Sequence, residues 1–289
     1  MGTKTATVLD VQMNVDIITG ESCSKMLQTI VQTLLFQRSQ IPFCYQMFRA
    51  IVNKIKAEMA GTEESKWGNY QLAKQREVAI KTLEELQTLF KELAVIVENS
   101  KQNVQAMVLF GSTVYTAKEA FVINLPMADE NHYAQHHRQG LESALKQITK
   151  QIILAEELCP SGKFIGPTNT FMLLGLVPMC RTEQSRMSSE VIEYRPIENY
   201  QLPASCQKYV IDVSVRGVCN EKLICCKRMN VFSDSFQSMQ IEEMKEVMND
   251  KKQQEVHENP ENMWYQIGKG IKGYKDVLIR GKSIWNDGL

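Results

Sequence analysis

The feature that most constrains this fold is a pair of helical patterns separated by a proline. Apolar side chains recur at three- and four-residue steps on both sides of Pro42, which is the spacing of helices that bury one face. Pro42 cannot donate a backbone N–H and disfavours helical geometry at Ile41. The pattern therefore predicts two helices, over residues 22–38 and 43–59. Between them lies a polar segment, residues 37–40 (Gln-Arg-Ser-Gln), which we call the polar knuckle. A buried helix needs no such segment, whereas a binding surface could use one.

The order of the remaining patterns predicts an α+β fold. A long amphipathic helix is predicted over 72–97 and a further helix over 141–158, each from apolar residues on one side. Strands are predicted over 104–110, 119–125, 164–177, 189–195, 208–216 and 222–228. Helices dominate the first half and strands the second half, which is typical of α+β domains.

Length and composition predict one domain with polar segments attached. A chain of 289 residues that is 44% hydrophobic can bury a full core. Residues 1–20 are polar with scattered valines, so we expect a short, flexible arm there and a single domain over 21–289. Residues 233–262 are rich in Glu, Lys, Gln, Asn and Asp, and they predict a mobile insertion or a short exposed helix. The last part, 263–289, is predicted to be a tail with a strand over 274–285.

The charge balance argues against two classes of partner. Lys+Arg and Asp+Glu both number 33, so the formal net charge is zero, and sequence-independent nucleic-acid binding needs a basic surface. No apolar run reaches the roughly 18 residues that a membrane-spanning helix requires. The N-terminus also lacks the basic and apolar regions of a secretory signal. We expect an intracellular protein with no nucleic-acid or membrane partner.

No pattern in the chain indicates a catalytic centre, a metal site or a cofactor. His132, His136 and His137 have no acidic or cysteine ligand at the usual spacing. The eight cysteines contain no C-x-x-C, so free buried thiols are the better interpretation. Residues 268–273 match a dinucleotide fingerprint by letter, but the chain ends too soon for the required helix and acidic residue. We therefore expect a protein that is not an enzyme.

Five segments, in the same order along the chain, share motifs with one protein family. They are the knuckle with its flanking aromatic and proline residues, 107–121 (MVLFGSTVYTAKEAF), the helix at 141–158, 192–203 (IEYRPIENYQLP) and 264–276 (WYQIGKGIKGYKD). With these segments the chain resembles the comet family, the HORMA-like adaptors that silence the spindle checkpoint.

The resemblance implies a HORMA-like domain, with three helices packed on one face of an antiparallel sheet and a C-terminal safety-belt region. In the family the C-terminal tail occupies the belt as a built-in ligand. Strand addition to a sheet edge is a sound physical means of holding such a tail, because backbone hydrogen bonds supply the affinity. The residues expected in this tail are Trp264, Tyr265, Lys272, Gly273 and Tyr274.

The resemblance also implies two protein partners. The first is the closed conformer of the spindle-checkpoint HORMA protein, and the residues expected to bind it are Gln37, Arg38, Lys146, Thr149 and Ile153. Lys146 stands where the family has an anchoring aromatic residue. The second partner is a hexameric AAA+ ATPase that returns the HORMA protein to its open form. Arg195 and Pro196 match the segment associated with the ATPase, although Ile197 replaces the basic residue that follows the proline in the family.

The expected location of such an adaptor is the nucleus and cytoplasm, and in mitosis the kinetochore or spindle. Two alternatives remain at this point. One is a different HORMA module that captures a peptide from another protein in an open belt. The other is an enzyme of unknown class, with a polar pocket that joins residues far apart in the sequence.

Overall fold

The computed structural model describes residues 6–59, 67–100, 104–129, 132, 137–158, 165–176, 194–216, 263–278 and 283–285. The strand expected at 222–228 and the insertion expected at 233–262 lie outside these residues. Within the described helices, none combines the length and the apolar character that crossing a bilayer requires.

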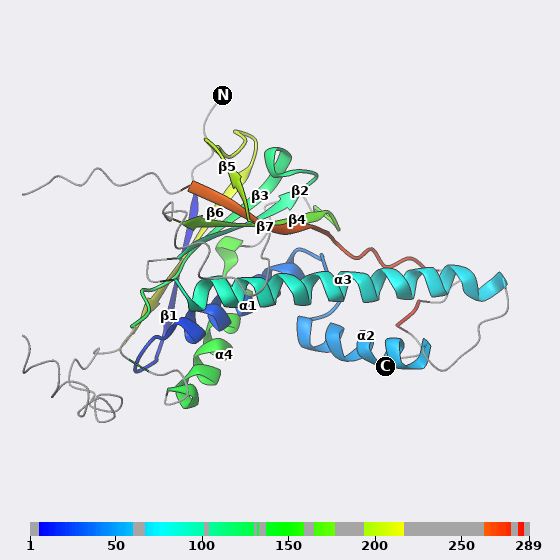
Figure 1. The fold of residues 1–289 in the computed structure, drawn as a ribbon, viewed down its shortest axis with the longest axis horizontal. Coiled ribbons are helices and arrows are strands. Elements are labelled where there is room, and N and C mark those ends of the chain that lie inside the picture. Colours follow the sequence, from blue (N-terminus) through cyan, green and yellow to red (C-terminus); the bar gives the residue numbers. More distant parts are fainter. Residues whose placement is uncertain are drawn as a thin grey trace, which may run out of the picture.

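A mixed β-sheet forms one layer of the molecule, with the helices beneath it in the view of Figure 1. The described residues contribute seven strands to it, in the order β1-β6-β3-β2-β4-β7-β5. Their bounds are β1 Thr7–Met13, β2 Gln105–Gly111, β3 Ala117–Asn124, β4 Asn169–Leu176, β5 Tyr194–Ile197, β6 Gln207–Val215 and β7 Met263–Lys272. β6 runs parallel to both of its neighbours, β1 and β3, whereas the other pairs are antiparallel. The expectation of a wholly antiparallel sheet is therefore wrong on the β1 side.

Strand β1 also corrects the expectation of a flexible arm over residues 1–20. Thr7–Met13 pairs with β6 along its whole length, and Val11 and Met13 are buried in the core. Val11 and Met13 lie two residues apart, so both side chains point to the same face of the strand, toward the core.

The helices agree closely with the periodic patterns in the sequence. Among the described residues they are α1 Gly20–Gln37, α2 Tyr45–Met59, α3 Trp67–Glu98 and α4 Arg138–Leu154, with short 3₁₀ helices η1 Val114–Thr116 and η3 Glu156–Leu158. The break at Pro42 is confirmed, because α1 ends before it and α2 begins after it. The resemblance implied three helices, whereas the described residues form four α-helices.

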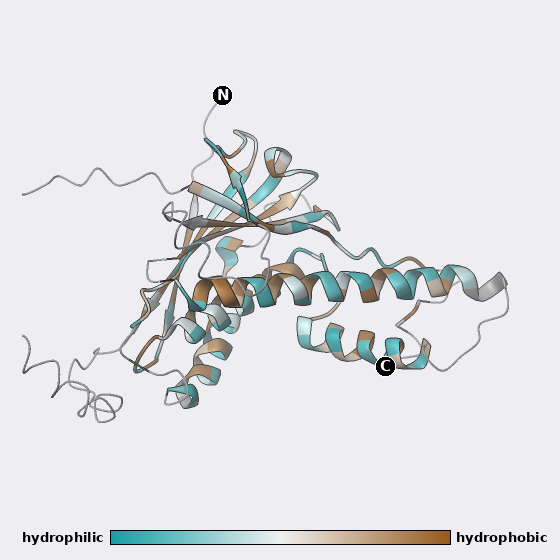
Figure 2. Ribbon diagram, in the orientation of Figure 1, coloured by the Kyte–Doolittle hydropathy of each residue, from teal (hydrophilic) through white to brown (hydrophobic). Residues whose placement is uncertain are grey.

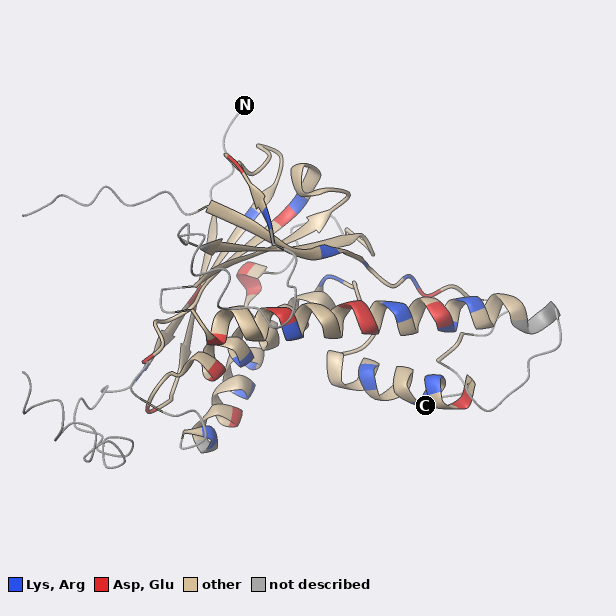
Figure 3. Cartoon of the chain, in the orientation of Figure 1, with Lys and Arg blue, Asp and Glu red and all other residues tan. Residues whose placement is uncertain are grey.

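One face of the sheet carries the helical layer and the main core (Figure 1). Helix α1 packs between α3 and α4, α4 reaches β1, and α3 reaches β7. Figure 2 shows hydrophobic residues along the strands and on α1, where the two layers meet. Figure 3 shows that charged residues are sparse on the sheet and recur along α3. A smaller apolar cluster, which includes Met107, Leu109 and Val122, covers the other face.

The C-terminal segment differs from the strand expected over 274–285. The strand is β7, which ends at Lys272 and lies between β4 and β5. Beyond it, Tyr274 and Trp285 are buried against Phe43 and Phe48, with ring centroids 5.3–6.5 Å apart. The aromatic residues that gave this segment its β-prone character therefore belong to a cluster that completes the packing of α2.

Candidate partner-binding surface

A groove with a volume of about 790 Å³ lies between α1, the start of α2 and α4. We call it the α1–α4 groove. Its lining includes three residues that the sequence predicted for partner binding, and it also includes apolar and polar residues that the sequence did not single out. The residues of most consequence are Phe36, Cys44, Tyr45, Leu145, Lys146, Thr149, Ile153 and Leu154.

Helix α4 turns one face into the core and the opposite face into this groove. Ile148 and Ile152 are fully buried, whereas Lys146 is exposed and Ile153 is 49% exposed. The 3.6-residue period places Lys146, Thr149 and Ile153 along one stripe, so the structure brings these three predicted residues together. The stripe continues into apolar surface, because Leu154 is 65% and Phe36 on α1 is 42% exposed. Contiguous exposed apolar surface next to polar residues is typical of a protein interaction site.

Gln37 in the polar knuckle holds the C-terminal end of α4. Its Nε2 donates to the backbone oxygen of Ile152 at 2.9 Å. That oxygen lies in the last turn of α4, where carbonyl groups lack partners within the helix. Oε1 of Gln37 is buried and has no hydrogen-bond partner among the residues that the structure describes. Gln37 therefore fixes the turn from which Ile153 and Leu154 project.

Arg38 does not face a partner, and this corrects the prediction from the sequence. Its side chain is 5% exposed, and Nε lies 2.6 Å from the Oε2 of Glu119 on β3. A terminal guanidinium nitrogen donates to the backbone oxygen of Leu158 at 2.7 Å. The guanidinium carbon also lies 4.9 Å from the ring centroid of Phe121 and 5.6 Å from that of Tyr209. Arg38 thus joins the end of α1 to the sheet and to η3, and its charge is paired with the buried carboxylate of Glu119.

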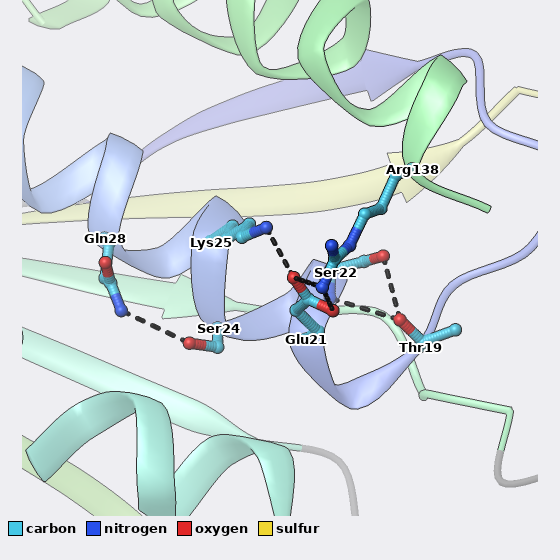
Figure 4. Close-up of polar contacts among 7 residues, drawn as sticks. All are labelled: Thr19, Glu21, Ser22, Ser24, Lys25, Gln28 and Arg138. Atoms are coloured by element: carbon cyan, nitrogen blue, oxygen red, sulfur yellow. Dashed lines mark hydrogen bonds and ion pairs between the residues drawn. The ribbon is translucent and has the colours of Figure 1, made fainter. Parts of the chain in front are cut away.

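The N-terminal end of α4 is held by a second polar cluster (Figure 4). Glu21 in the first turn of α1 contacts Lys25 at 2.5 Å and Arg138, the first residue of α4, at 3.2 Å. The hydrogen bond from Lys25 and the contact with Arg138 lower the pKa of Glu21, although partial burial opposes them. Thr19 precedes α1, and its hydroxyl accepts from the backbone N–H of Ser22, which is a helix N-cap. Helix α4 is consequently fixed to α1 at both ends.

A comparison of the sequence with protein families indicates a binding function. The family model described as "p31comet: Mad1 and Cdc20-bound-Mad2 binding" matches residues 8–225. The chain belongs to the p31comet family. The matched range runs through the knuckle and α4, which are the elements that build the α1–α4 groove. The family binds Mad2 in its Mad1- and Cdc20-bound states, which indicates an adaptor related to the spindle checkpoint. A comparison with curated proteins finds no match.

In this p31comet family member, the residues predicted to face the ATPase lie at one end of the strand order, whereas α4, which lines the groove, contacts β1 at the other end. Arg195 and Pro196 are exposed on β5, which among the described strands is the edge strand opposite β1. Proline is tolerated at such an edge because it has no N–H to offer a further strand.

The residues predicted for the tail divide into two groups. Trp264, Tyr265 and Lys272 belong to β7, where Trp264 and Tyr265 are half-buried and Lys272 is exposed. Gly273 and Tyr274 are buried next to the knuckle. The Tyr274 backbone N–H donates to the backbone oxygen of Gln40 at 2.8 Å, and the Gly273 N–H donates to the backbone oxygen of Thr168 at 2.7 Å.

The sequence missed two kinds of residue at this site. Phe36 and Leu154 fit the apolar pattern of their helices, so the sequence does not indicate that their side chains are exposed. On α4, Gln151 contacts Gln12 of β1 and Gln147 contacts Asn14, the residue that follows β1. Their only signal in the sequence is that two amides lie four residues apart on one helix face. Such a pair is also compatible with solvent exposure, so it predicts no contact by itself.

Proposed function

We propose that this chain is a non-catalytic adaptor that binds the closed conformer of Mad2 through the α1–α4 groove. The observation that carries the proposal is the groove-lining stripe of Lys146, Thr149 and Ile153 on α4, a helix fixed at both ends. The stripe continues into the exposed side chains of Leu154 and of Phe36 on α1. A helix that is already fixed and carries exposed apolar side chains next to polar ones presents a surface that a partner can cover at a low ordering cost. The family match supplies the class of partner.

The adaptor role needs only a modest preference between two conformers of its partner. A tenfold preference for closed over open Mad2 corresponds to about 1.4 kcal/mol, and a ligand shifts a conformational equilibrium only by such a difference in affinity. We further propose that the complex is presented to a hexameric AAA+ ATPase, which converts Mad2 to the open form and silences the checkpoint. Arg195 and Pro196 are the residues proposed to face the ATPase. The proposed location is the nucleus and cytoplasm.

The position of β7 supports this proposal over a peptide-capturing HORMA module. β7 pairs with β4 on one side and with β5 on the other. The chain's own segment thus fills the sheet position between these two strands, and a captured peptide strand would have to replace it.

The test is binding of the purified chain to Mad2 locked in the closed form and to Mad2 locked in the open form. We expect selective binding to the closed form, and Ile153→Asp should weaken it at least tenfold because the charge would be buried in an apolar contact. Tyr70→Asp is the matched control, since Tyr70 is 67% exposed on α3 and does not line the groove. Equal binding to both forms, or an Ile153→Asp variant that binds like the control, would refute the proposal.

A second measurement separates the ATPase from Mad2. Arg195→Ala is expected to leave the affinity for closed Mad2 within twofold and to slow ATPase-dependent conversion of Mad2. Unchanged conversion by this variant would refute the assignment of β5 to the ATPase and leave the Mad2 assignment in place.

A further inference from the structure

Two glutamines of α4 attach this helix to the outer edge of the sheet. Gln151 lies against Gln12 on β1. The Gln12 backbone N–H donates to the Oε1 of Gln151 at 3.0 Å, and the Nε2 of Gln151 donates to the backbone oxygen of Gln12 at 2.6 Å. One helical turn earlier, the Oε1 of Gln147 accepts from the backbone N–H of Asn14 at 3.4 Å. The two amides therefore contact backbone groups two residues apart along the chain.

These backbone groups point away from the sheet. Among the strands that the structure describes, β1 is the last on its side of the sheet, and one edge of it pairs with β6. The Met13 oxygen accepts from Arg216 N–H at 2.7 Å next to β6, so Gln12 and Asn14, on either side of Met13, direct their N–H and C=O groups outward. Unpaired groups of this kind are the template for pairing with another strand. Because a glutamine amide carries one donor and one acceptor group, Gln151 offers Gln12 what a neighbouring strand would offer.

The glutamines also determine which face of α4 points into the groove. Gln147 and Gln151 share one face of the helix, and the stripe of Lys146 and Ile153 lies on a different face. On the opposite flank, α4 is held to α1 by the bond from Gln37 to the Ile152 oxygen. A rotation of α4 that moved the stripe would break the hydrogen bonds of Gln147 and Gln151 with Asn14 and Gln12.

We propose that Gln147 and Gln151 are positioning residues. They set the rotation of α4 by occupying the strand-pairing positions of Gln12 and Asn14, and this rotation directs Ile153 into the α1–α4 groove. The same contacts close the β1 edge of the sheet to strand addition at these two positions. The part of this inference that concerns the groove rests on the proposed binding of Mad2, whereas the part that concerns the edge does not.

The test uses three substitutions that either remove or retain the acceptor oxygen. Gln151→Met and Gln147→Met keep a long, helix-favouring side chain but remove the amide, whereas Gln147→Glu retains an oxygen that can accept from Asn14. Ser143→Met is the control, because Ser143 is an exposed residue of α4 that does not line the groove. The measurements are site-resolved hydrogen exchange of the Gln12 and Asn14 amides and of α4, the melting temperature, and the Kd for closed Mad2.

Gln151→Met is expected to speed exchange at Gln12 at least fivefold and to raise the Kd at least threefold, with the melting temperature within a few degrees of the unaltered chain. Gln147→Met should speed exchange at Asn14, and Gln147→Glu should restore it to within twofold. Unchanged exchange at Gln12 in Gln151→Met would overturn the inference. Faster exchange with an unchanged Kd would overturn the positioning role.

A failure of the proposed function is distinguishable from a failure of this inference. If the unaltered chain does not bind closed Mad2, the proposed function fails. In that case exchange at Gln12 and along 146–153 in Gln151→Met still decides the inference: faster exchange at both supports it, and faster exchange at neither overturns it. Faster exchange at Gln12 alone overturns the positioning of α4.

Discussion

Replacing Arg38 alone should destabilise the protein far more than replacing Arg38 and Glu119 together. The two side chains are only 5% and 7% exposed and lie 2.6 Å apart. Arg38 also donates to the Leu158 oxygen and lies over the rings of Phe121 and Tyr209. Arg38→Met keeps much of the side-chain volume and the apolar stem, so its main effect is to remove the charge and the donors.

The magnitude follows from what is left behind. Arg38→Met leaves the carboxylate of Glu119 buried without its partner, and breaking a buried pair in this way costs about 3–5 kcal/mol. In the double variant Arg38→Met/Glu119→Leu no charge remains buried, and such replacements are often neutral or stabilising. We therefore expect the double variant within about 2 kcal/mol of the unaltered chain. Because Glu119→Leu alone leaves the Arg38 charge buried at a similar cost, the coupling energy between the two sites should be at least about 4 kcal/mol.

The assay is urea unfolding of the unaltered chain, both single variants and the double variant, each at the same pH and salt concentration. Lys56 and Glu84 provide a matched control, because their charged atoms also lie 2.6 Å apart but the side chains are 59% and 54% exposed. The same cycle with Lys56→Met and Glu84→Leu should give a coupling of at most about 1 kcal/mol. Equal coupling energies for the buried and exposed pairs would refute the argument from burial.

Three further perturbations test other contacts of the fold. Trp285→Ala should lower the free energy of unfolding by about 3–5 kcal/mol, because the ring is 5% exposed in the aromatic cluster beside α2; a loss below about 1 kcal/mol in urea would contradict that packing. Gly273→Ala should destabilise by about 1–3 kcal/mol, since the new Cβ would lie 2.4 Å from Oε1 of Gln40, and an unchanged melting temperature would show that this approach is not tight. The pKa of Glu21 is lowered from 4.5 chiefly by Lys25, so its stabilising effect is present above pH 4.5 and is lost as the pH falls through the lowered pKa. Glu21→Gln should accordingly lower the melting temperature at pH 7 and have no effect at a pH low enough to protonate Glu21 in both the folded and the unfolded chain. An equal effect at pH 7 and at that low pH would argue against ionisation as the cause.

The helices were predictable because their signal is local. Each of the four helical patterns in the sequence corresponds to a helix of the structure with ends shifted by a few residues, since periodic apolar residues and Pro42 act within one element. The strands β2, β3 and β6 were also predictable, because β-prone residues in these segments alternate or form a continuous apolar run.

The sheet topology depends on contacts between distant segments, and these leave little local signal. β1 pairs with β6, about 200 residues further along the chain, and only a few scattered valines marked it in the sequence. The segment after β7 shows the opposite error. Tyr274 and Trp285 favour strands by composition, but the same bulky rings also favour an aromatic core cluster, and the tertiary contacts with Phe43 and Phe48 decided between the two.

The polar knuckle shows why the site was only partly predictable. We interpreted its polarity as a sign of a binding surface, because the interior of a buried helix needs no polar side chains. The ends of helices and turns do need them, since their carbonyl groups lack partners. Gln37 donates to Ile152, Arg38 to Leu158 and Gln40 to Gly166.

These three bonds give the knuckle a different relation to the partner from the one expected. Each acceptor belongs to α4 or to the chain that follows it, so the knuckle fixes the end of the groove-forming helix from inside the protein. A substitution such as Gln37→Ala would then weaken partner binding by loosening the turn that carries Ile153 and Leu154. Its effect on the Kd should accordingly come with faster hydrogen exchange in the last turn of α4. Loss of a direct contact with the partner would change the Kd alone, so the exchange rates distinguish the two roles.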